Sequence, residues 1–225
     1  NSGNKPSLFQ SENEIAVVNS ALGCSFSGKS TMIGTSGGGF DLMAEGLSLQ
    51  GQSEIPLTVY LAARPGPATG VPTYTAQSDL NIALRSGHGE FPRVVIAPGN
   101  SKECIEKTNE AIHLAEKFNT LSIVLSDKHI AESQFSFDTK IDPILKVPLN
   151  RKIPGKSIVR SNGYEHDANG NTIESAKLVE IGAKRRISNY KKIQKYCNKF
   201  QMVKIYGPKK SKNLVVGWGS TKSVI

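Results

Sequence analysis

The sequence predicts an α/β fold in which a parallel sheet carries helices on both faces. Short apolar, β-prone runs alternate with segments whose apolar residues recur at helical spacing, from about residue 11 to residue 126. Glycine- and proline-rich turns separate these segments. Because consecutive parallel strands need a crossover connection, usually a helix, this alternation is typical of a parallel sheet covered on both sides.

The first predicted element is a helix over residues 11–23. Ser11 is the expected N-cap, Glu14 stands at the capping-box position, and Gly23 is the expected stop. The remaining elements continue the alternation. The predicted strands are residues 30–33, 55–63, 92–97 and 120–126, the predicted helices are residues 40–49, 77–86 and 101–118, and a glycine-rich turn occupies residues 34–39.

The character of the chain changes after this region, and three parts are expected. Residues 1–140 should form one α/β domain, incomplete at its N-terminal side, and residues 141–212 a linker with a hairpin turn and a basic helix. Residues 213–225 have the pattern of a strand, a glycine turn and the start of a helix. We therefore expect them to open a second, truncated α/β domain.

The composition excludes several classes of protein and of binding site. The chain has 225 residues, of which 38% are hydrophobic, yet no apolar run approaches the roughly 18 residues of a membrane span. Cys24, Cys104 and Cys197 are far apart and form no CxxC pair, unlike zinc or iron–sulfur ligands. We therefore expect no membrane segment, no metal site in this chain, and a reducing, cytoplasmic location.

The net charge of +9 is concentrated near the end of the chain. Residues 184–212 contain eleven lysines and arginines and no aspartate or glutamate. Apolar residues recur at helical spacing from Leu178 to Phe200, so much of this charge fits the solvated face of a helix. The alternative is a docking surface for an acidic electron carrier. Nucleic acid is disfavoured, because no separate nucleic-acid motif accompanies the charge.

Residues 23–30 match the phosphate-binding pattern G-x-x-x-x-G-K-[ST], and residues 123–127 resemble the strand and aspartate that hold magnesium beside such a loop. A phosphate loop needs a strand before it and a helix after it, so that backbone N–H groups point at the phosphates. Here the predicted order is helix, loop, strand. A nucleotide hydrolase therefore stays only an alternative, and Lys29 is predicted to be an exposed turn residue.

An arginine follows the predicted strand 55–63, at the mouth of a loop over residues 64–73 that contains three prolines and two glycines. Loops at the carboxyl ends of parallel strands hold ligand-binding groups in many α/β proteins. A guanidinium group there can pair with a carboxylate or a phosphate. Arg64 is thus either an anion-binding residue or a solvated arginine in an ordinary turn.

Four motifs in order resemble the α subunit of 2-oxoacid:ferredoxin oxidoreductases, which use thiamine diphosphate. They are Glu14-Ile-Ala16, Thr35-Ser-Gly-Gly-Gly-Phe-Asp-Leu-Met43, Arg64-Pro-Gly-Pro-Ala-Thr-Gly-Val-Pro-Thr73 and Gly87-His-Gly-Glu-Phe-Pro-Arg93. The likeness is dense over residues 10–130 and looser at residues 161–167 and 216–221. It implies the pyrimidine-binding domain of the cofactor site and the oxidative decarboxylation of a 2-oxoacid to an acyl-CoA. A non-catalytic, truncated relative that serves as a scaffold is the second alternative.

The resemblance also implies roles for single residues. Glu14 matches the glutamate that hydrogen-bonds N1′ of the cofactor's aminopyrimidine and so favours the tautomer that activates the thiazolium, although a capping role would also suit it. Arg64 matches the arginine that pairs with the substrate carboxylate. The remaining candidates line two turns. Thr35, Ser36 and Gly37 approach the cofactor or pack on a neighbouring helix, whereas Thr69 and Thr73 shape the substrate pocket or only the turn.

Some features depart from the family or stay without a role. The family's Tyr-Pro-Ile-Thr-Pro loop, which also contacts substrate, is missing upstream of this chain. Ala63 stands where relatives often have glutamine, which would loosen selectivity, and the sequence does not decide which 2-oxoacid is used. His88 and Glu90 match a family motif whose mechanistic role does not follow from their chemistry.

The resemblance implies a hetero-oligomer, because a thiamine site of this kind lies between two domains. A β subunit is expected to supply the diphosphate-binding domain with its Mg²⁺, and a [4Fe-4S] cluster. Coenzyme A is the expected co-substrate, and ferredoxin the expected electron acceptor.

Overall fold

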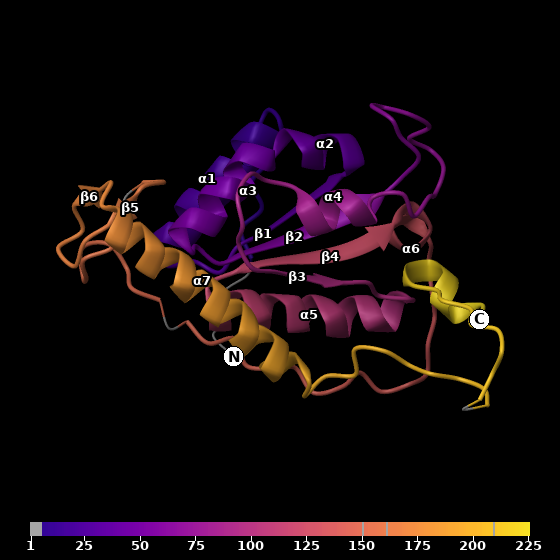
Figure 1. Cartoon of the computed structure of the whole chain (residues 1–225). Helices are drawn as coiled ribbons and strands as arrows, with labels where there is room; N and C mark the ends of the chain where they lie inside the picture. The colour runs from indigo at the N-terminus through magenta and orange to yellow at the C-terminus, as the bar shows by residue number, and fades with distance from the viewer. Residues whose placement is uncertain (1–5, 150, 161, 209) are drawn as a thin grey trace.

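A computed structural model describes residues 6–149, 151–160, 162–208 and 210–225. Its centre is a four-stranded sheet in the order β1-β2-β4-β3, in which every neighbouring pair is parallel (Figure 1). The strands are β1 (Met32–Ser36), β2 (Leu57–Ala63), β3 (Arg93–Ile96) and β4 (Leu121–Asp127). The predicted parallel sheet is confirmed.

Helices cover both faces of this sheet, as predicted. In Figure 1 one group lies above the sheet and another lies below it. The upper group contains α1 (Glu14–Phe26), α2 (Gly37–Leu42), α3 (Ala44–Ser53) and α4 (Leu80–Arg85), and the lower group contains α5 (Ser101–Phe118) and α7 (Ala176–Cys197). The short helix α6 (Lys128–Glu132) follows β4 at the carboxyl end of the sheet. No helix in the described part of the chain is long and apolar enough to cross a membrane.

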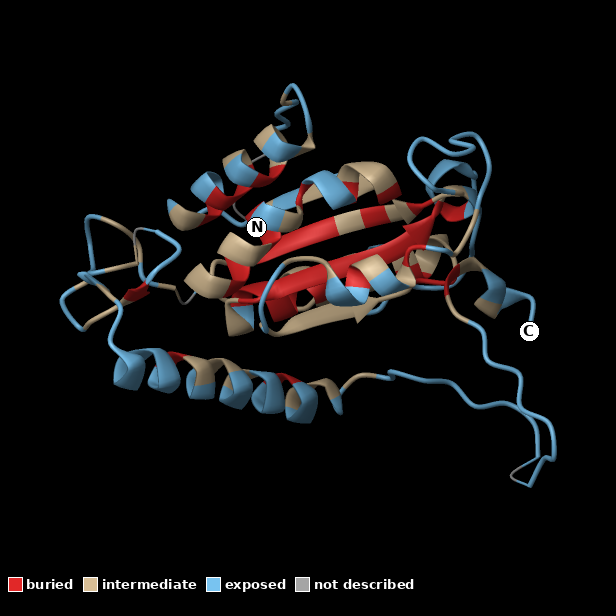
Figure 2. Ribbon diagram, turned by 45° about the horizontal axis from the view of Figure 1, so that its top comes forward, coloured by how far each residue is buried: buried red, intermediate tan, exposed pale blue. Residues whose placement is uncertain are grey.

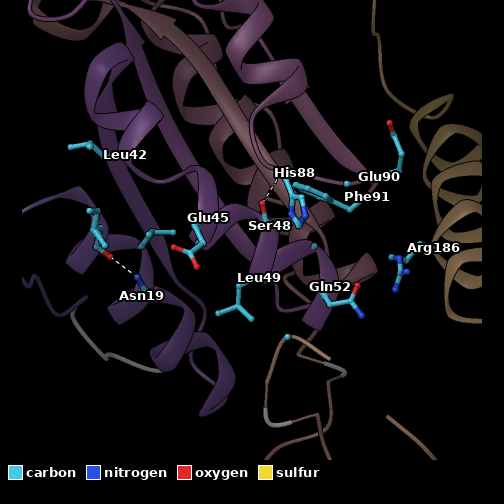
Figure 3. Close-up of a pocket in the computed structure, with 16 residues that line it drawn as sticks. Asn19, Leu42, Glu45, Ser48, Leu49, Gln52, His88, Glu90, Phe91 and Arg186 are labelled. Carbon is cyan, nitrogen blue, oxygen red and sulfur yellow. Dashed lines mark hydrogen bonds between the residues drawn. The ribbon is translucent and has the colours of Figure 1, made fainter. Parts of the chain in front are cut away.

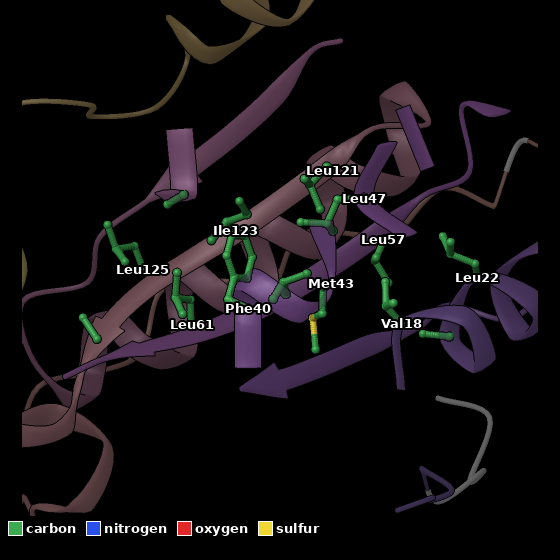
Figure 4. Close-up of a cluster of buried hydrophobic side chains, with 14 residues drawn as sticks. Val18, Leu22, Phe40, Met43, Leu47, Leu57, Leu61, Leu121, Ile123 and Leu125 are labelled. Carbon is green, nitrogen blue, oxygen red and sulfur yellow. The ribbon is translucent and has the colours of Figure 1, made fainter. Parts of the chain in front are cut away.

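The core lies on the two central strands. All seven residues of β4 are buried, which is expected for a strand covered on both faces (Figure 2). Phe40, Met43 and Leu47 bring side chains from α2, α3 and the turn between them into the same cluster as Leu61 and Ile123 (Figure 4). Burial of these side chains anchors the upper helices on the sheet.

The first helix differs from its prediction at both ends. Asn13 is the N-cap, because its side-chain oxygen accepts the Ala16 N–H at 2.9 Å. The predicted cap, Ser11, lies outside the helix, and its hydroxyl oxygen is buried without a hydrogen-bond partner among the described residues. Gly23 does not stop the helix, which continues to Phe26. A glycine weakens a helix interior by only about 1 kcal/mol, which the packing of neighbouring residues offsets.

The glycine-rich segment also differs from its prediction. Strand β1 includes Thr35 and Ser36, and the three glycines that follow begin helix α2 instead of forming a turn. The predicted helix over residues 40–49 is divided at Met43 between α2 and α3. The change is possible because glycine lets the start of α2 approach other side chains closely, as described below.

The hairpin predicted in the linker is present. Strands β5 (Glu165–His166) and β6 (Thr172–Ile173) pair antiparallel across a turn in which the Asp167 N–H donates to the Asn171 carbonyl at 3.0 Å. Ser161, part of the looser motif 161–167, lies outside the described residues. Helix α7 follows, and Glu165 of the hairpin forms an ion pair with Arg186 of α7 at 2.5 Å.

The apolar face predicted for α7 is buried only in part. Gly182 and Ile193 are its buried residues, whereas several predicted inner residues are exposed (Figure 2). The exposed fractions are 38% for Leu178, 51% for Ile181, 58% for Ile187 and 46% for Tyr190. The helix itself is confirmed, but within the described chain it has little surface to pack on. Lys209 of the basic segment lies outside the described residues.

The strand expected near residues 213–216 is absent: Leu214, Val215 and Val216 are exposed and unpaired in any described sheet. A short 3-10 helix, η1 (Gly219–Ser223), follows instead. The Gln77 amide donates to the Trp218 carbonyl at 2.6 Å, and the Ser220 N–H donates to the Asp127 carboxylate at 3.3 Å. This end of the chain therefore docks at the carboxyl end of the sheet.

Candidate functional site

The apparent phosphate loop does not have the geometry that phosphate binding requires. Gly23 lies inside α1, Lys29 is exposed, and β1 follows where a helix N-terminus would be needed. Asp127, the predicted magnesium residue of that alternative, is fully buried. Its carboxylate caps α6 by accepting the Ile130 N–H at 3.1 Å. Lys29 is exposed, as predicted, and directly follows the turn at residues 27 and 28.

Three consecutive glycines at the carboxyl end of β1 each face a different group. A Cβ atom on Gly37 would lie 2.8 Å from Oδ2 of Asp79, and one on Gly38 would lie 3.4 Å from the carbonyl oxygen of Ala68. On Gly39, a Cβ atom would collide with the Glu14 carboxylate and the Thr35 hydroxyl. The start of α2 thus joins the predicted cofactor residues to the loop that follows Arg64.

Glu14 and Thr35 form the first part of the site. Glu14 lies in the first turn of α1, where the helix dipole favours a negative charge. Its carboxylate is half-buried and meets Gly39 beside the Thr35 hydroxyl, in a space that a Cβ atom would fill. A half-buried carboxylate in such a cradle fits a ring nitrogen that carries a proton, which is the kind of partner that N1′ of an aminopyrimidine provides.

Arg64 forms the second part. It directly follows β2, is half-buried, and its Nε atom is buried without a hydrogen-bond partner among the described residues. It lines a pocket of about 120 Å³ at the carboxyl end of the sheet. The other lining residues are Gly37, Gly38, Asp41, Pro65, Gly66, Pro67, Ala68, Asp79 and Ile82. The strand-end arginine therefore faces a small cavity.

Asp79 also belongs to this pocket, although the sequence did not point to it. Its side chain is 8% exposed, and burial raises its pKa, against the opposing effect of the Ser78 hydroxyl. The Ser78 hydroxyl lies 3.1 Å from Oδ1 of Asp79 and 3.2 Å from the carbonyl oxygen of Arg64. An aspartate just before a helix has the pattern of an N-cap, so nothing in the local sequence separates this residue from an ordinary cap.

Thr69 and Thr73, the other predicted substrate residues, are exposed on the loop and do not line the Arg64 pocket. The loop is turned back on itself, since the Val71 N–H donates to the Pro65 carbonyl at 3.2 Å. The peptide bond between Gly66 and Pro67 is cis. The structure therefore brings Arg64 to a pocket but leaves both threonines at the surface of this chain.

His88 and Glu90 line a different and larger hollow. This groove of about 670 Å³ lies between α1, α3 and the loop before β3, and Arg186 of α7 borders it (Figure 3). The backbone N–H of His88 donates to the Ser48 hydroxyl at 2.7 Å, which fixes the loop to α3. These two residues are thus placed apart from the Arg64 pocket.

The three cysteines are free and separate, and no group of three or more metal-ligating side chains gathers within the described residues. Burial raises the pKa of the Cys104 thiol to about 11, with further contributions from Glu103 and Asp127. Cys104 is therefore an uncharged, packed side chain near neutral pH.

Comparison with known proteins finds relatives over nearly the whole chain. The family described as pyruvate flavodoxin/ferredoxin oxidoreductase, thiamine diphosphate-binding, matches residues 1–181. The α subunit of 2-oxoacid:ferredoxin oxidoreductase 1 from Sulfurisphaera tokodaii is 33% identical over 242 aligned residues, which cover 97% of this chain and 39% of that protein. The 2-oxoglutarate synthase subunit KorA of Archaeoglobus fulgidus is 41% identical over 129 residues, covering 56% of this chain and 37% of that protein.

A solved structure has the same fold. It is the 2-oxoglutarate:ferredoxin oxidoreductase from Magnetococcus marinus with 2-oxoglutarate, coenzyme A and succinyl-CoA bound. It matches with a TM-score of 0.73 and 29% identity over 97% of this chain and 42% of that one. The chain spans about two fifths of the length of these relatives. The match to residues 1–181 and the near-complete alignments establish that this chain belongs to the thiamine diphosphate-binding family of pyruvate flavodoxin/ferredoxin oxidoreductases.

Proposed function

We propose that this chain is part of the α subunit of a 2-oxoacid:ferredoxin oxidoreductase, which decarboxylates a 2-oxoacid oxidatively and forms an acyl-CoA. One observation carries the proposal. The glycines that begin α2 contact both the Glu14 carboxylate and the loop that follows Arg64. One short segment thus touches the carboxylate suited to the cofactor and lines the same pocket as the guanidinium suited to a substrate carboxylate.

Thiamine diphosphate, when bound, supplies the electron sink that the loss of CO₂ from a 2-oxoacid requires. On the proposed function, Glu14 hydrogen-bonds the aminopyrimidine ring, and the Thr35 hydroxyl borders the same cradle. Ser36 and Gly37 shape the turn into α2. Arg64 holds the carboxylate of the 2-oxoacid, which orients the oxo carbon for reaction.

Thr69 and Thr73 contribute to substrate binding only if another domain or subunit covers their loop. We propose that a β subunit does so and supplies the diphosphate site, its Mg²⁺ and a [4Fe-4S] cluster. The relatives named as α subunits support a multi-subunit enzyme. Coenzyme A is the proposed acyl acceptor, ferredoxin the proposed electron acceptor, and the cytoplasm the proposed location. The three-part division at residues 140 and 212 is likewise a proposal.

The decisive experiment assembles the full-length protein with its partner subunits and measures the reduction of a viologen dye by pyruvate or 2-oxoglutarate with coenzyme A. Glu14→Ala should abolish turnover and the exchange of the thiazolium C2 proton of bound cofactor. Glu12→Gln, which changes an exposed glutamate two residues away, should leave both unchanged. Exchange that persists in Glu14→Ala would refute the cofactor assignment.

Arg64→Ala should raise the KM for the 2-oxoacid strongly and leave C2 proton exchange intact, because it acts on the substrate and not on the cofactor. Arg85→Ala removes an exposed arginine at the end of α4 and is the matched control. If the assembled wild-type protein shows no turnover with any 2-oxoacid, it is a non-catalytic scaffold. Lys29→Ala should be silent, whereas a nucleotide hydrolase would lose nucleotide binding.

A further inference from the structure

Asp79 stands at the N-cap of α4 but does not cap that helix. Its side chain makes no capping hydrogen bond, although aspartate is among the best capping residues. The side chain is 8% exposed, and its Oδ2 atom has no hydrogen-bond partner in the described part of the chain. A buried carboxylate oxygen without a partner is unfavourable, so its placement needs another explanation.

The carboxylate is turned toward the Arg64 pocket. Both side chains line the same cavity of about 120 Å³, and each carries a buried polar atom without a described partner, Oδ2 of Asp79 and Nε of Arg64. Gly37 leaves room for Oδ2, because a Cβ atom there would lie only 2.8 Å away. The two oppositely charged side chains therefore line the same pocket at the carboxyl end of the sheet.

The main chain of Arg64 is held from the same side. The Ser78 hydroxyl reaches the Arg64 carbonyl oxygen at 3.2 Å and Oδ1 of Asp79 at 3.1 Å. Ser78 and Asp79 thus restrain the end of β2, beside the pocket that the Arg64 side chain lines. Asp41, which is exposed, also lines the pocket.

We infer that Asp79 is a positioning residue for Arg64, whose guanidinium it directs for recognition of the substrate carboxylate. Asp79 would not touch the substrate itself. This inference rests on the proposed function, since it assigns Arg64 to the 2-oxoacid. Asparagine is the sharpest replacement, because it keeps the shape of the side chain and one acceptor oxygen for the Ser78 hydroxyl, and it removes the charge.

The test compares Asp79→Asn, Arg64→Ala and the double variant in the full-length protein assembled with its partner subunits. Asp138→Asn, at an exposed aspartate outside all helices and strands, is the control for the same chemical change. Asp79→Asn should raise the KM for the 2-oxoacid about tenfold and change kcat less than about twofold. In the Arg64→Ala background it should leave kcat/KM unchanged, because the group that it positions is gone.

Exchange of the cofactor C2 proton provides a second readout and should equal that of the wild type in Asp79→Asn. A purely structural defect would disturb it together with kcat. A wild-type KM in Asp79→Asn, or an equal loss of kcat/KM with and without Arg64, would overturn the positioning role alone. A wild-type complex that neither binds nor turns over 2-oxoacids would refute the proposed function, and the positioning role with it.

Discussion

The carboxylate of Glu14 lies against the Cα atom of Gly39, so that α1 and α2 meet at the point where the cofactor residue is held. The contact leaves no room for a Cβ atom, and the Thr35 hydroxyl closes the same space. A glutamate at the start of a helix usually points into solvent. Here the close approach of α2 restrains it in one direction.

Gly39→Ala should therefore displace Glu14 and lower the free energy of unfolding by about 1–3 kcal/mol, the usual cost of overpacking. Gly23→Ala is the matched control, because Gly23 lies in α1 and a Cβ atom there would meet nothing within 4 Å. It should raise stability by up to about 1 kcal/mol. Chemical denaturation of both variants measures the difference, and equal effects would contradict the close contact at Gly39.

Asp79→Asn should be at least as stable as the wild type at neutral pH. Because burial raises the pKa of Asp79, the folded protein binds the proton more tightly than the unfolded chain does. The contribution of this group to stability is greatest below the unfolded pKa of about 4 and is lost as pH rises through the folded pKa. Denaturation between about pH 3 and pH 7 should show a smaller fall in stability for Asp79→Asn than for the wild type.

Glu103→Gln should release the C-terminal segment. Glu103 accepts the Gly99 N–H at 2.8 Å, forms an ion pair with Lys222, and lies 3.5 Å from Lys204. The chain has a single tryptophan, Trp218, which is half-buried next to this contact, so its emission should shift to longer wavelength in the variant. Glu180→Gln, which removes an exposed glutamate of α7, should leave the emission unchanged.

Acidification should also release the C-terminal segment of the wild-type protein and shift the emission of Trp218 to longer wavelength. Burial acts to raise the pKa of Glu103, but the hydrogen bonds and charges of Lys222, Gly99 and Lys204 together lower it. The stabilisation is therefore present above the ordinary glutamate pKa of about 4.3 and is lost as pH falls through the lower folded pKa. An emission that does not change during acidification would contradict this role for Glu103.

Arg151→Ala should lower the free energy of unfolding by about 3 kcal/mol or more, because it leaves the buried carboxylate of Glu116 without its partner. Arg151 also donates to the carbonyl oxygens of Ser25 at 3.0 Å and Lys29 at 2.6 Å, and so fixes the linker to the end of α1. Lys152→Ala, at the exposed neighbouring residue, should change stability by less than about 0.5 kcal/mol. Thermal or urea denaturation distinguishes the two.

The sheet and its helices could be predicted because their signals are local. Strand β4 contains the buried apolar run Ile123, Val124 and Leu125, and α5 begins and ends where its pattern does. The cap of α1 could not be decided in the same way, since Ser11 and Asn13 are both good caps and only the path of the chain selects between them. The strand predicted near Leu214 failed because no described strand lies beside it to pair with.

The candidate site was predictable only in part, because one of its residues is distinguished by contacts between segments that are distant in sequence. Glu14 and Arg64 could be identified because their motifs resemble a known family, whereas Asp79 has the local pattern of a helix cap. What distinguishes it is its place beside Gly37 and Arg64, which are distant in sequence. The exposed apolar side of α7 is a similar case, because helical spacing predicts a face but not what that face packs on.

The glycines at the start of α2 also determine which substitutions the protein tolerates in this segment. Every other amino acid carries a Cβ atom, so there is no conservative replacement at Gly37 or Gly39. In a library that samples all substitutions, these two positions should reject small and large residues alike, whereas Gly23, equally helical, should accept most of them. The number of substitutions that a glycine position accepts would then depend on how closely other atoms approach it, and not on the fact that the residue is a glycine in a helix.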